Sequence, residues 1–333
     1  MNFIIPMAGK GSRLRPHTLL NPKPFFKIAG KTLVERLLED LAKNSATEKI
    51  EKIGFVIGDL NAQQKQHLTD IALRLGAEPY FYQQKEALGT AHAVFCATEL
   101  LQGKVIVAFA DTLFQGNIAL DTSAEGSLWV KAIEDPSAFG VVKLDKNGVI
   151  TDYVEKPKTF VSDLAMIGVY YFKHAEQLKT ELAYLIDNQV IKSGEYQLPD
   201  ALRRLTEKGV ALKTTVVQTW LDCGNAEATL QAMESILQAE GSQVHKNAKI
   251  IDSIIIEPCF IADGVVLERA VVGPFVSLEE GVQLKNTNIS HSIVHAKTAL
   301  ANLSLAKSVF GEMANLAGKQ QKMSVGDYSK MDI

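Results

Sequence analysis

The N-terminal stretch "MNFIIPMAGKGSRLRPHTLLNPKP" (1–24) decides how the rest of the chain is interpreted. It begins as a short apolar run that ends at Pro6, and it continues as a loop with Gly9, Gly11 and several cations. A loop that leaves the carboxyl end of a buried strand is where open α/β sheets bind ligands. Glycines let the backbone approach a ligand closely, and consecutive backbone N–H groups can bind an anion. The stretch therefore predicts an anion-binding loop at the edge of an α/β sheet.

Two familiar phosphate-binding patterns do not match this loop. The fingerprint G-x-G-x-x-G would need glycine where the chain has Leu14, and no G-x-x-x-x-G-K-[ST] spacing is present. Arg13 and Lys23 nevertheless supply permanent positive charge, the first as a forked donor and the second as a point charge. These residues favour a polyphosphate site, and an ordinary turn with solvated cations remains the alternative on this pattern alone.

The composition of the 333 residues is that of an ordinary globular protein, with 47% apolar and 22% charged residues. A net charge of −3 leaves no basic excess, so we expect no nucleic-acid partner. The apolar runs are too short for a signal peptide or for the roughly 18 residues of a membrane helix. Cys96, Cys223 and Cys259 lie far apart and form no C-x-x-C pair, which favours a reducing compartment. We therefore expect a cytoplasmic protein without a membrane partner.

Residues 1–238 alternate short β-branched runs with longer amphipathic stretches. The leucines of "TLVERLLEDLAK" (32–43) recur at helical spacing, and "NAQQKQHLTDIALRLG" (61–76) predicts a polar helix closed by glycine. "VIVAFAD" (105–111) is apolar on both faces, as in the interior of a parallel sheet covered by helices. Three later runs predict a mixed extension of the sheet that carries part of the site: "SLWVKAI" (127–133), "GVVKL" (140–144) and "IGVYYF" (167–172).

Residues 239–333 follow a different pattern, in which apolar residues recur about every six positions. The series is Ile255, Ile261, Leu267, Val272, Leu278, Leu284, Ile289, Val294, Leu300, Leu305 and Phe310. A period near six predicts a β-solenoid of about five coils, with one short strand on each face of a triangular coil. A β-sandwich of short strands stays the alternative. We expect the polar tail after Gly318 to cap the stack or to be loose.

The N-terminal loop closely resembles the signature of the sugar-1-phosphate nucleotidyltransferases, G-x-G-[ST]-R-L-x-P-x-T followed by P-K. The matching residues are Gly9, Gly11, Ser12, Arg13, Leu14, Pro16, Thr18, Pro22 and Lys23. The resemblance continues through "QKEALGTAHAV", "FAD", "FGVV", "VEKP", "GVYYF", "GEYQLPD" and "WLDCG". It is nearest to the glucose-1-phosphate thymidylyltransferases that carry a C-terminal left-handed β-helix. It implies a Rossmann-like, mostly parallel mixed sheet flanked by helices over residues 1–238, followed by the left-handed β-helix over 239–333.

The resemblance implies an enzyme of nucleotide-sugar biosynthesis that joins a nucleoside triphosphate to a sugar 1-phosphate and releases pyrophosphate. Its nucleotide-binding residues would be Ala8, Gly9, Gly11, Ser12, Arg13, Lys23, Gln84, Gly89 and Thr90. Gln84 and Gly89 have the spacing of the base-reading pair of the thymidylyltransferases. A glutamine amide suits a pyrimidine edge, so dTTP or UTP is favoured and GTP stays open. The catalytic residues would be Arg13, Lys23 and Asp111.

Two aspartates resemble the family's metal ligands, Asp111 at the end of "VIVAFAD" and Asp222 in "TWLDCG". Mg²⁺ is commonly bound by one or two carboxylates together with substrate phosphates and water, so two aspartates are sufficient. Without the resemblance, each aspartate could simply cap the following turn. Ala110 departs from the glycine that relatives often have beside the first ligand.

The resemblance also implies a site for the sugar phosphate, with glucose 1-phosphate favoured. Its residues would be Gly140, Glu155, Lys156 and Trp220. Lys156 would bind the phosphate and Glu155 the sugar hydroxyls, while an exposed ion pair before a proline is the alternative. Some thymidylyltransferases have an arginine where this chain has Ser193, so either Lys192 or Lys156 alone would contact the phosphate.

Three other functions remain open at this stage. The first is a mannose-1-phosphate guanylyltransferase. The second is a bifunctional uridylyltransferase whose solenoid transfers an acyl group, with His291 and His295 as candidate bases. The third is a non-catalytic regulatory relative that binds nucleotide sugars. We also expect a homo-oligomer that assembles through the β-helix.

Overall fold

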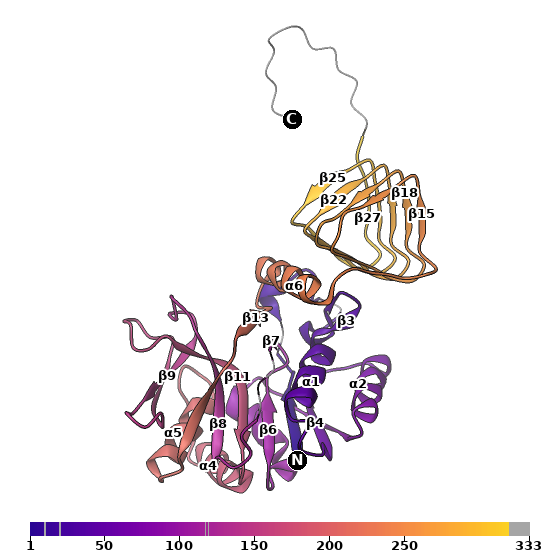
Figure 1. Cartoon of the computed structure of the whole chain (residues 1–333). Coiled ribbons are helices and arrows are strands. Elements are labelled where there is room, and N and C mark those ends of the chain that lie inside the picture. Colours follow the sequence, from indigo (N-terminus) through magenta and orange to yellow (C-terminus); the bar gives the residue numbers. More distant parts are fainter. Residues whose placement is uncertain (10, 20, 117, 119, 320–333) are drawn as a thin grey trace. The chain divides into compact units, whose positions relative to one another are not determined.

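The computed structural model describes residues 1–9, 11–19, 21–116, 118 and 120–319. The chain forms two compact units, which differ in architecture (Figure 1). The first comprises Met1–Phe26 and Lys31–Thr229, and the second comprises Lys27–Gly30 and the chain from Leu230 onward. The short segment Lys27–Gly30 thus belongs to the second unit, although both of its neighbours in sequence belong to the first.

The first unit is built on a nine-stranded sheet in which β1 (Asn2–Pro6) is an inner strand. β1 pairs in parallel with β4 on one side and with β6 on the other, and Phe3, Ile4 and Ile5 are completely buried. The other strands of this sheet are β4 (Lys52–Ile57), β5 (Glu78–Gln83), β6 (Val105–Ala108), β8 (Gly126–Ala132), β9 (Gly140–Leu144), β10 (Ile150–Glu155), β11 (Leu164–Phe172) and β12 (Leu212–Val216). The loop after Pro6 therefore begins at an inner strand of the sheet.

The sheet changes from parallel to antiparallel at β11. This strand pairs antiparallel with β6, β8 and β9, and β10 pairs antiparallel with β9. The predicted mixed extension is confirmed, and it brings the later strands next to β6. A separate two-stranded ladder joins β7 (Thr112–Gln115) to β13 (Thr219–Asp222).

Helices form where the periodicity predicts them. α1 (Leu33–Asn44) begins at the N-cap Thr32, whose hydroxyl accepts from the backbone N–H of Glu35, and α2 (Ala62–Arg74) begins with a capping box at Asn61. The remaining helices are α3 (Thr90–Cys96), α4 (Ala175–Asp187), α5 (Leu198–Glu207), α6 (Ala226–Glu240) and the 3₁₀ turns η1 (Ser12–Leu14), η2 (Lys23–Phe25) and η3 (Thr98–Leu100). α3, α4 and α5 share a buried apolar core with the central strands. None of the described helices is long and apolar enough to cross a membrane.

The second unit is a stack of short parallel strands, as expected for a left-handed β-helix (Figure 1). Ile255 is in register with Val272, and Val272 with Ile289, so the 17-residue step in the sequence is one turn of the coil. The three sheets contain five, five and four strands. The strands are β14 (Gln243–Val244), β15 (Lys249–Ile251), β16 (Ile254–Ile255), β17 (Cys259–Ile261), β18 (Val266–Glu268), β19 (Val271–Val272), β20 (Val276–Leu278), β21 (Gln283–Lys285), β22 (Asn288–Ser290), β23 (Ser292–Val294), β24 (Ala299–Ala301), β25 (Ser304–Ala306), β26 (Val309–Phe310) and β27 (Asn315–Ala317).

The boundary between the two units falls inside α6, between Thr229 and Leu230. The expected domain limits, 1–238 and 239–333, stay a prediction. Most of the tail that was expected to cap the solenoid, residues 320–333, lies outside the described residues. Two very short strands, β2 (Lys27–Ile28) and β3 (Lys31–Thr32), follow the N-terminal loop.

Candidate active site

The loop after β1 turns sharply at Gly11, which adopts the left-handed conformation at φ +57°. The hydroxyl of Thr18 donates to the carbonyl of Gly11 over 2.7 Å and closes the turn. A Cβ at this position would lie 2.9 Å from Cβ of Lys23, closer than real side chains approach. Glycine is therefore required here both by the backbone conformation and by the close approach of Lys23.

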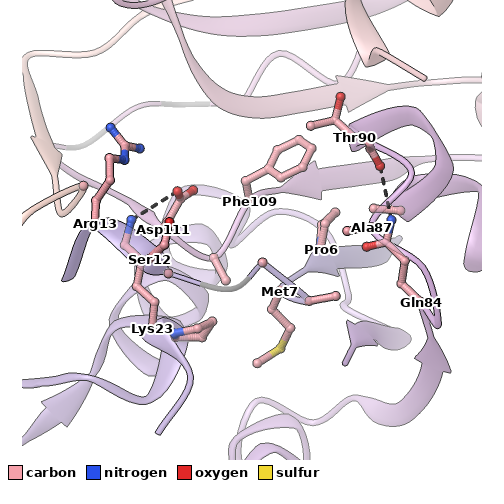
Figure 2. Close-up of a pocket in the computed structure, with 18 of the residues that line it drawn as sticks. Pro6, Met7, Ser12, Arg13, Lys23, Gln84, Ala87, Thr90, Phe109 and Asp111 are labelled. Atoms are coloured by element: carbon pink, nitrogen blue, oxygen red, sulfur yellow. Dashed lines mark hydrogen bonds and ion pairs between the residues drawn. The ribbon is translucent and has the colours of Figure 1, made fainter. Parts of the chain in front are cut away.

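A cavity of about 360 Å³ opens above this loop. All nine residues predicted to bind the nucleotide line it: Ala8, Gly9, Gly11, Ser12, Arg13, Lys23, Gln84, Gly89 and Thr90. Figure 2 shows Arg13, Lys23 and Asp111 at one end of this cavity, and Gln84, Ala87 and Thr90 at the other. The predicted nucleotide-binding residues thus line one cavity, with the charged side chains at one end and the amide of Gln84 at the other.

The amide end of the cavity is held by a short hydrogen-bond chain. Nε2 of Gln84 donates to the carbonyl of Gly89 over 3.2 Å and lies 3.2 Å from Nδ1 of His92. Burial lowers the pKa of His92 below its usual value, which favours the neutral ring that can accept this hydrogen bond. Sequence reasoning missed His92, although it lies within the quoted "LGTAHAV" segment.

A second cavity, of about 390 Å³, adjoins the first. Gly140, Glu155 and Trp220 line it, as predicted for the sugar-phosphate residues. The residues that line both cavities are Arg13, Thr90, Phe109, Asp111 and Glu195. Arg13 and Asp111 therefore lie where the contents of the two cavities would meet.

Trp220 and Lys156 differ in how the structure places them. The indole N–H of Trp220 donates to the hydroxyl of Thr112 over 2.9 Å, and its ring meets Phe139 edge-on with centroids 4.7 Å apart. Lys156 is exposed, has a left-handed backbone at φ +45°, and is not among the residues that line either cavity. Its backbone N–H donates to the carbonyl of Phe139 over 3.1 Å. The predicted role of Lys156 stays a prediction.

The two predicted metal ligands are brought together by the ladder of β7 and β13. Asp222 is opposite Thr112 in this antiparallel pair, and Asp111 immediately precedes Thr112 in sequence. Asp222 lines the second cavity, while Asp111 lines both. Nζ of Lys23 lies 3.1 Å from a carboxylate oxygen of Asp111, and this ion pair is drawn in Figure 2.

The electrostatics of the aspartates fit a divalent cation. Burial raises the pKa of Asp222 and the nearby negative charge of Asp111 acts in the same direction, while Lys23 and Arg13 oppose the shift. Two carboxylates that disfavour each other's charge are stabilised when a cation is shared between them. No cluster of three or more His, Cys, Asp or Glu side chains suited to a metal occurs among the described residues. Mg²⁺ is commonly held by one or two carboxylates together with substrate phosphates and water, so the two aspartates fit this ion.

Sequence reasoning did not single out several residues that line the cavities, and it considered Lys192 as a phosphate-binding cation. Glu195, Phe109 and Met166 line the cavities, and the first of these lies in the quoted "GEYQLPD" motif. Lys192 forms an ion pair with Asp200, whose side chain is 7% exposed. Lys192 is not among the residues that line the two cavities. The "GEYQLPD" motif itself could have indicated Glu195, whereas the ion pair between Lys192 and Asp200 is not evident from spacing.

The two histidines proposed for acyl transfer lie in the second unit. Nδ1 of His291 is 2.7 Å from a carboxylate oxygen of Glu234, and its ring centroid is 5.3 Å from that of Phe275. The backbone N–H of His295 donates to the carbonyl of Phe310 over 3.0 Å. Neither histidine is among the residues that line the two cavities.

Comparison with known protein families identifies the first unit. Residues 3–239 match the family model described as "Nucleotidyl transferase". The chain belongs to the nucleotidyl transferase family. The match spans the anion-binding loop and both aspartates, so the residues that surround the cavities lie within the family's own region. The expected enzyme class, a sugar-1-phosphate nucleotidyltransferase, is confirmed at this level.

Similar proteins support the same assignment. The chain is 26% identical to the glucose-1-phosphate thymidylyltransferase of Streptomyces antibioticus, over 100% of this chain and 99% of the relative. It is 30% identical to the bifunctional protein GlmU of Methanococcus maripaludis, over 77% of this chain and 60% of the relative. The solved structure of a UDP-glucose pyrophosphorylase with UDP-glucose is similar in fold, with a TM-score of 0.58 at 21% identity, over 72% of this chain and 99% of that one.

Proposed function

We propose that the protein transfers a nucleotidyl group from a nucleoside triphosphate to a sugar 1-phosphate. The triphosphate occupies the first cavity with its base toward Gln84, and the sugar phosphate occupies the second. The observation that carries this proposal is that Arg13 and Asp111 line both cavities. The α-phosphate of one substrate and the phosphate of the other meet beside these two side chains.

The reaction is an in-line displacement in which a phosphate oxygen of the sugar phosphate attacks the α-phosphorus. The bond from the α-phosphorus to the bridging oxygen breaks, and pyrophosphate departs with that electron pair. The attacking oxygen is already anionic, so no side chain needs to remove a proton. Positioning and charge neutralisation therefore supply the catalysis.

The fixed cations neutralise the charge that moves during the displacement. Lys23 is almost fully buried and paired with Asp111, and both contacts restrict the position of its ammonium group. Arg13 offers a fork of donors at the junction of the cavities. Asp111 and Asp222 are the residues that would hold Mg²⁺, which when bound would neutralise phosphate charge and orient the two substrates.

We further propose dTTP or UTP as the nucleotide and glucose 1-phosphate as the sugar. An amide held by Gly89 and His92 presents a fixed hydrogen-bonding edge, which suits a pyrimidine. The thymidylyltransferase of Streptomyces antibioticus, which aligns over the whole chain, acts on glucose 1-phosphate by its name. GTP with mannose 1-phosphate is the alternative substrate pair.

A substrate panel tests the proposal. Purified protein is mixed with Mg²⁺, each nucleoside triphosphate and each of several sugar 1-phosphates, and pyrophosphate release is measured. We expect release with a pyrimidine triphosphate and a reduction of at least about 100-fold in Asp111→Asn, because electrostatic stabilisation is lost. Asp187→Asn, an exposed change at the end of α4, is the control. Absence of release from every pair would contradict the proposal.

The same panel addresses the alternatives. A non-catalytic relative would bind nucleotide sugars tightly without exchanging them with pyrophosphate. A bifunctional enzyme would also consume acetyl-CoA, and this consumption would depend on His291 or His295. The phosphate-binding cations and both aspartates are all present around the cavities, which supports catalysis over regulation alone.

We also propose that the protein assembles through its β-helix in the cytoplasm. β14, β15 and β16 are edge strands of the three solenoid sheets. Three isoleucines of this first coil are exposed, Ile250 and Ile251 in β15 at 44% and 47% and Ile254 in β16 at 61% of their full exposure. An edge strand with exposed apolar side chains is a template for a second copy of the same coil.

A further inference from the structure

A short hairpin connects the anion-binding loop to α1. It comprises β2 (Lys27–Ile28), a turn at Ala29 and Gly30, and β3 (Lys31–Thr32). Both turn residues have positive φ, +46° and +79°, as the two-residue type I′ turn requires. Residues Lys27–Gly30 belong to the second unit, so this hairpin tip is built into the solenoid.

Two buried side chains of the solenoid hold the tip by its backbone. The N–H of Ala29 donates to the hydroxyl of Ser277 over 3.1 Å, and the N–H of Gly30 donates to a carboxylate oxygen of Glu279 over 3.1 Å. Ser277 and Glu279 are 0% and 1% exposed. The hydroxyl of Ser277 also lies 3.4 Å from the same carboxylate oxygen. The two consecutive N–H groups of the turn thus fit one polar clamp.

The fit of the tip is tight in packing as well as in hydrogen bonding. A Cβ at Gly30 would lie 2.4 Å from the ring of Phe260, so only glycine can occupy this place. Ala29 adopts a left-handed conformation that costs a non-glycine residue about 1 kcal/mol or more. Such a conformation persists only where surrounding contacts favour it, and the hydroxyl of Ser277 supplies one such contact.

One backbone hydrogen bond joins Phe26, at the base of the hairpin, to Lys23, and a second joins Phe26 to the start of α1. The N–H of Phe26 donates to the carbonyl of Lys23 over 2.9 Å, and the N–H of Leu33 donates to the carbonyl of Phe26 over 3.0 Å. The Lys23 side chain is 7% exposed and points to Asp111 at 3.1 Å. Only a few residues of the chain therefore separate the clamped tip from the cation of the nucleotide cavity.

We propose that Ser277 and Glu279 are positioning residues that act on nucleotidyl transfer through Lys23. The solenoid would then do more than assemble subunits, because its clamp holds the turn that follows η2, and η2 carries the catalytic cation Lys23. This inference rests on the proposed function. Nζ of Lys27 lies 4.0 Å from the other carboxylate oxygen of Glu279, so the N–H of Gly30, at 3.1 Å, is the closer contact.

The test is a double-mutant cycle with pyrophosphate release by the full chain as the readout. Ser277→Ala, Glu279→Ala and Glu279→Gln are each made in the wild type and in Lys23→Ala. Glu280→Gln and Ser304→Ala, which are exposed on the same solenoid, are matched controls. Hydrogen exchange at the amides of Ala29 and Gly30 is measured in parallel, and thermal unfolding reports whether each variant is folded.

In the wild-type background we expect Ser277→Ala and Glu279→Ala to lower kcat about 5- to 10-fold, because a misplaced cation stabilises the transition state less. In Lys23→Ala the same changes should alter kcat less than 2-fold. Glu279→Gln keeps an acceptor for Gly30 and should stay within 2-fold of wild type. Exchange at the two amides should accelerate at least 10-fold in the alanine variants.

Equal losses of kcat in both backgrounds, or none in the wild type, would overturn the positioning role. Ser277→Ala removes a single oxygen atom, so it carries the test if Glu279→Ala does not fold. A wild-type protein that releases no pyrophosphate from any substrate pair would instead overturn the proposed function, and the inference with it.

Discussion

Arg13 and Asp111 carry the proposed chemistry because each faces two cavities at once. Two phosphate-bearing substrates repel each other, and a guanidinium between them offsets this repulsion without a proton transfer. Nζ of Lys23 lies 3.1 Å from a carboxylate oxygen of Asp111, so the two charges compensate each other beside the junction of the cavities.

Gln84 is a second single residue with a specific role, since we expect its amide to read the base. Replacing Gln84 by alanine removes an amide that is already held by Gly89, so the base loses a fixed partner. We expect KM for the preferred triphosphate to rise about 10-fold, a loss of about 1.4 kcal/mol, with a smaller change in kcat. Steady-state kinetics with several triphosphates measure this.

Gln83→Ala is the matched control for Gln84, because Gln83 is exposed and its amide donates to Asp59 instead. An unchanged KM for every triphosphate in Gln84→Ala would contradict a role in reading the base.

Among the secondary-structure elements, β20 is followed directly by Glu279, whose buried carboxylate loses hydration when it ionises. Burial raises the pKa of Glu279 above its usual 4.5, although Lys27 and the N–H of Gly30 oppose the shift. A group whose pKa is raised by folding contributes most stability below its unfolded pKa, and this contribution is lost as pH rises through the folded value. The contribution of Glu279 to the free energy of unfolding should therefore fall as pH rises above about 4.5.

The measurement for this element is urea unfolding of wild type and Glu279→Gln as a function of pH. Glutamine does not titrate, so the free energy of unfolding of wild type should fall relative to the variant as pH rises from about 4.5. The other titrating groups are shared by the two proteins and largely cancel. A difference that is independent of pH would contradict a raised pKa.

Elements with a local signal could be predicted from the sequence. The six-residue period predicted the solenoid because each short strand of a coil buries an apolar residue. The structure has the same periodicity, since Ile255, Val272 and Ile289 are in register on successive coils. The hairpin clamp could not be predicted, since Gly30 and Glu279 are separated by 249 positions. Glu195 was missed for a related reason: its motif marks a loop, and only the tertiary fold shows that the loop lines both cavities.

At the scale of the whole molecule, assembly is the property that the exposed first coil predicts. Light scattering at micromolar concentration should show an oligomer, and Ile254→Lys, which adds charge to an edge strand, should shift it toward a smaller species. Leu73→Lys, a change at an exposed leucine of α2, is the control. A wild-type monomer would contradict assembly through the solenoid.

The central claim is that two aspartates from different strands share one divalent cation between two phosphates. The most direct measurement is a crystal structure of the protein with Mn²⁺ and its nucleotide sugar, in which anomalous scattering locates the metal. We expect one peak in contact with carboxylate oxygens of both Asp111 and Asp222, at about 2.1 Å, together with phosphate oxygens. A metal elsewhere, or two carboxylates turned into separate cavities, would contradict it.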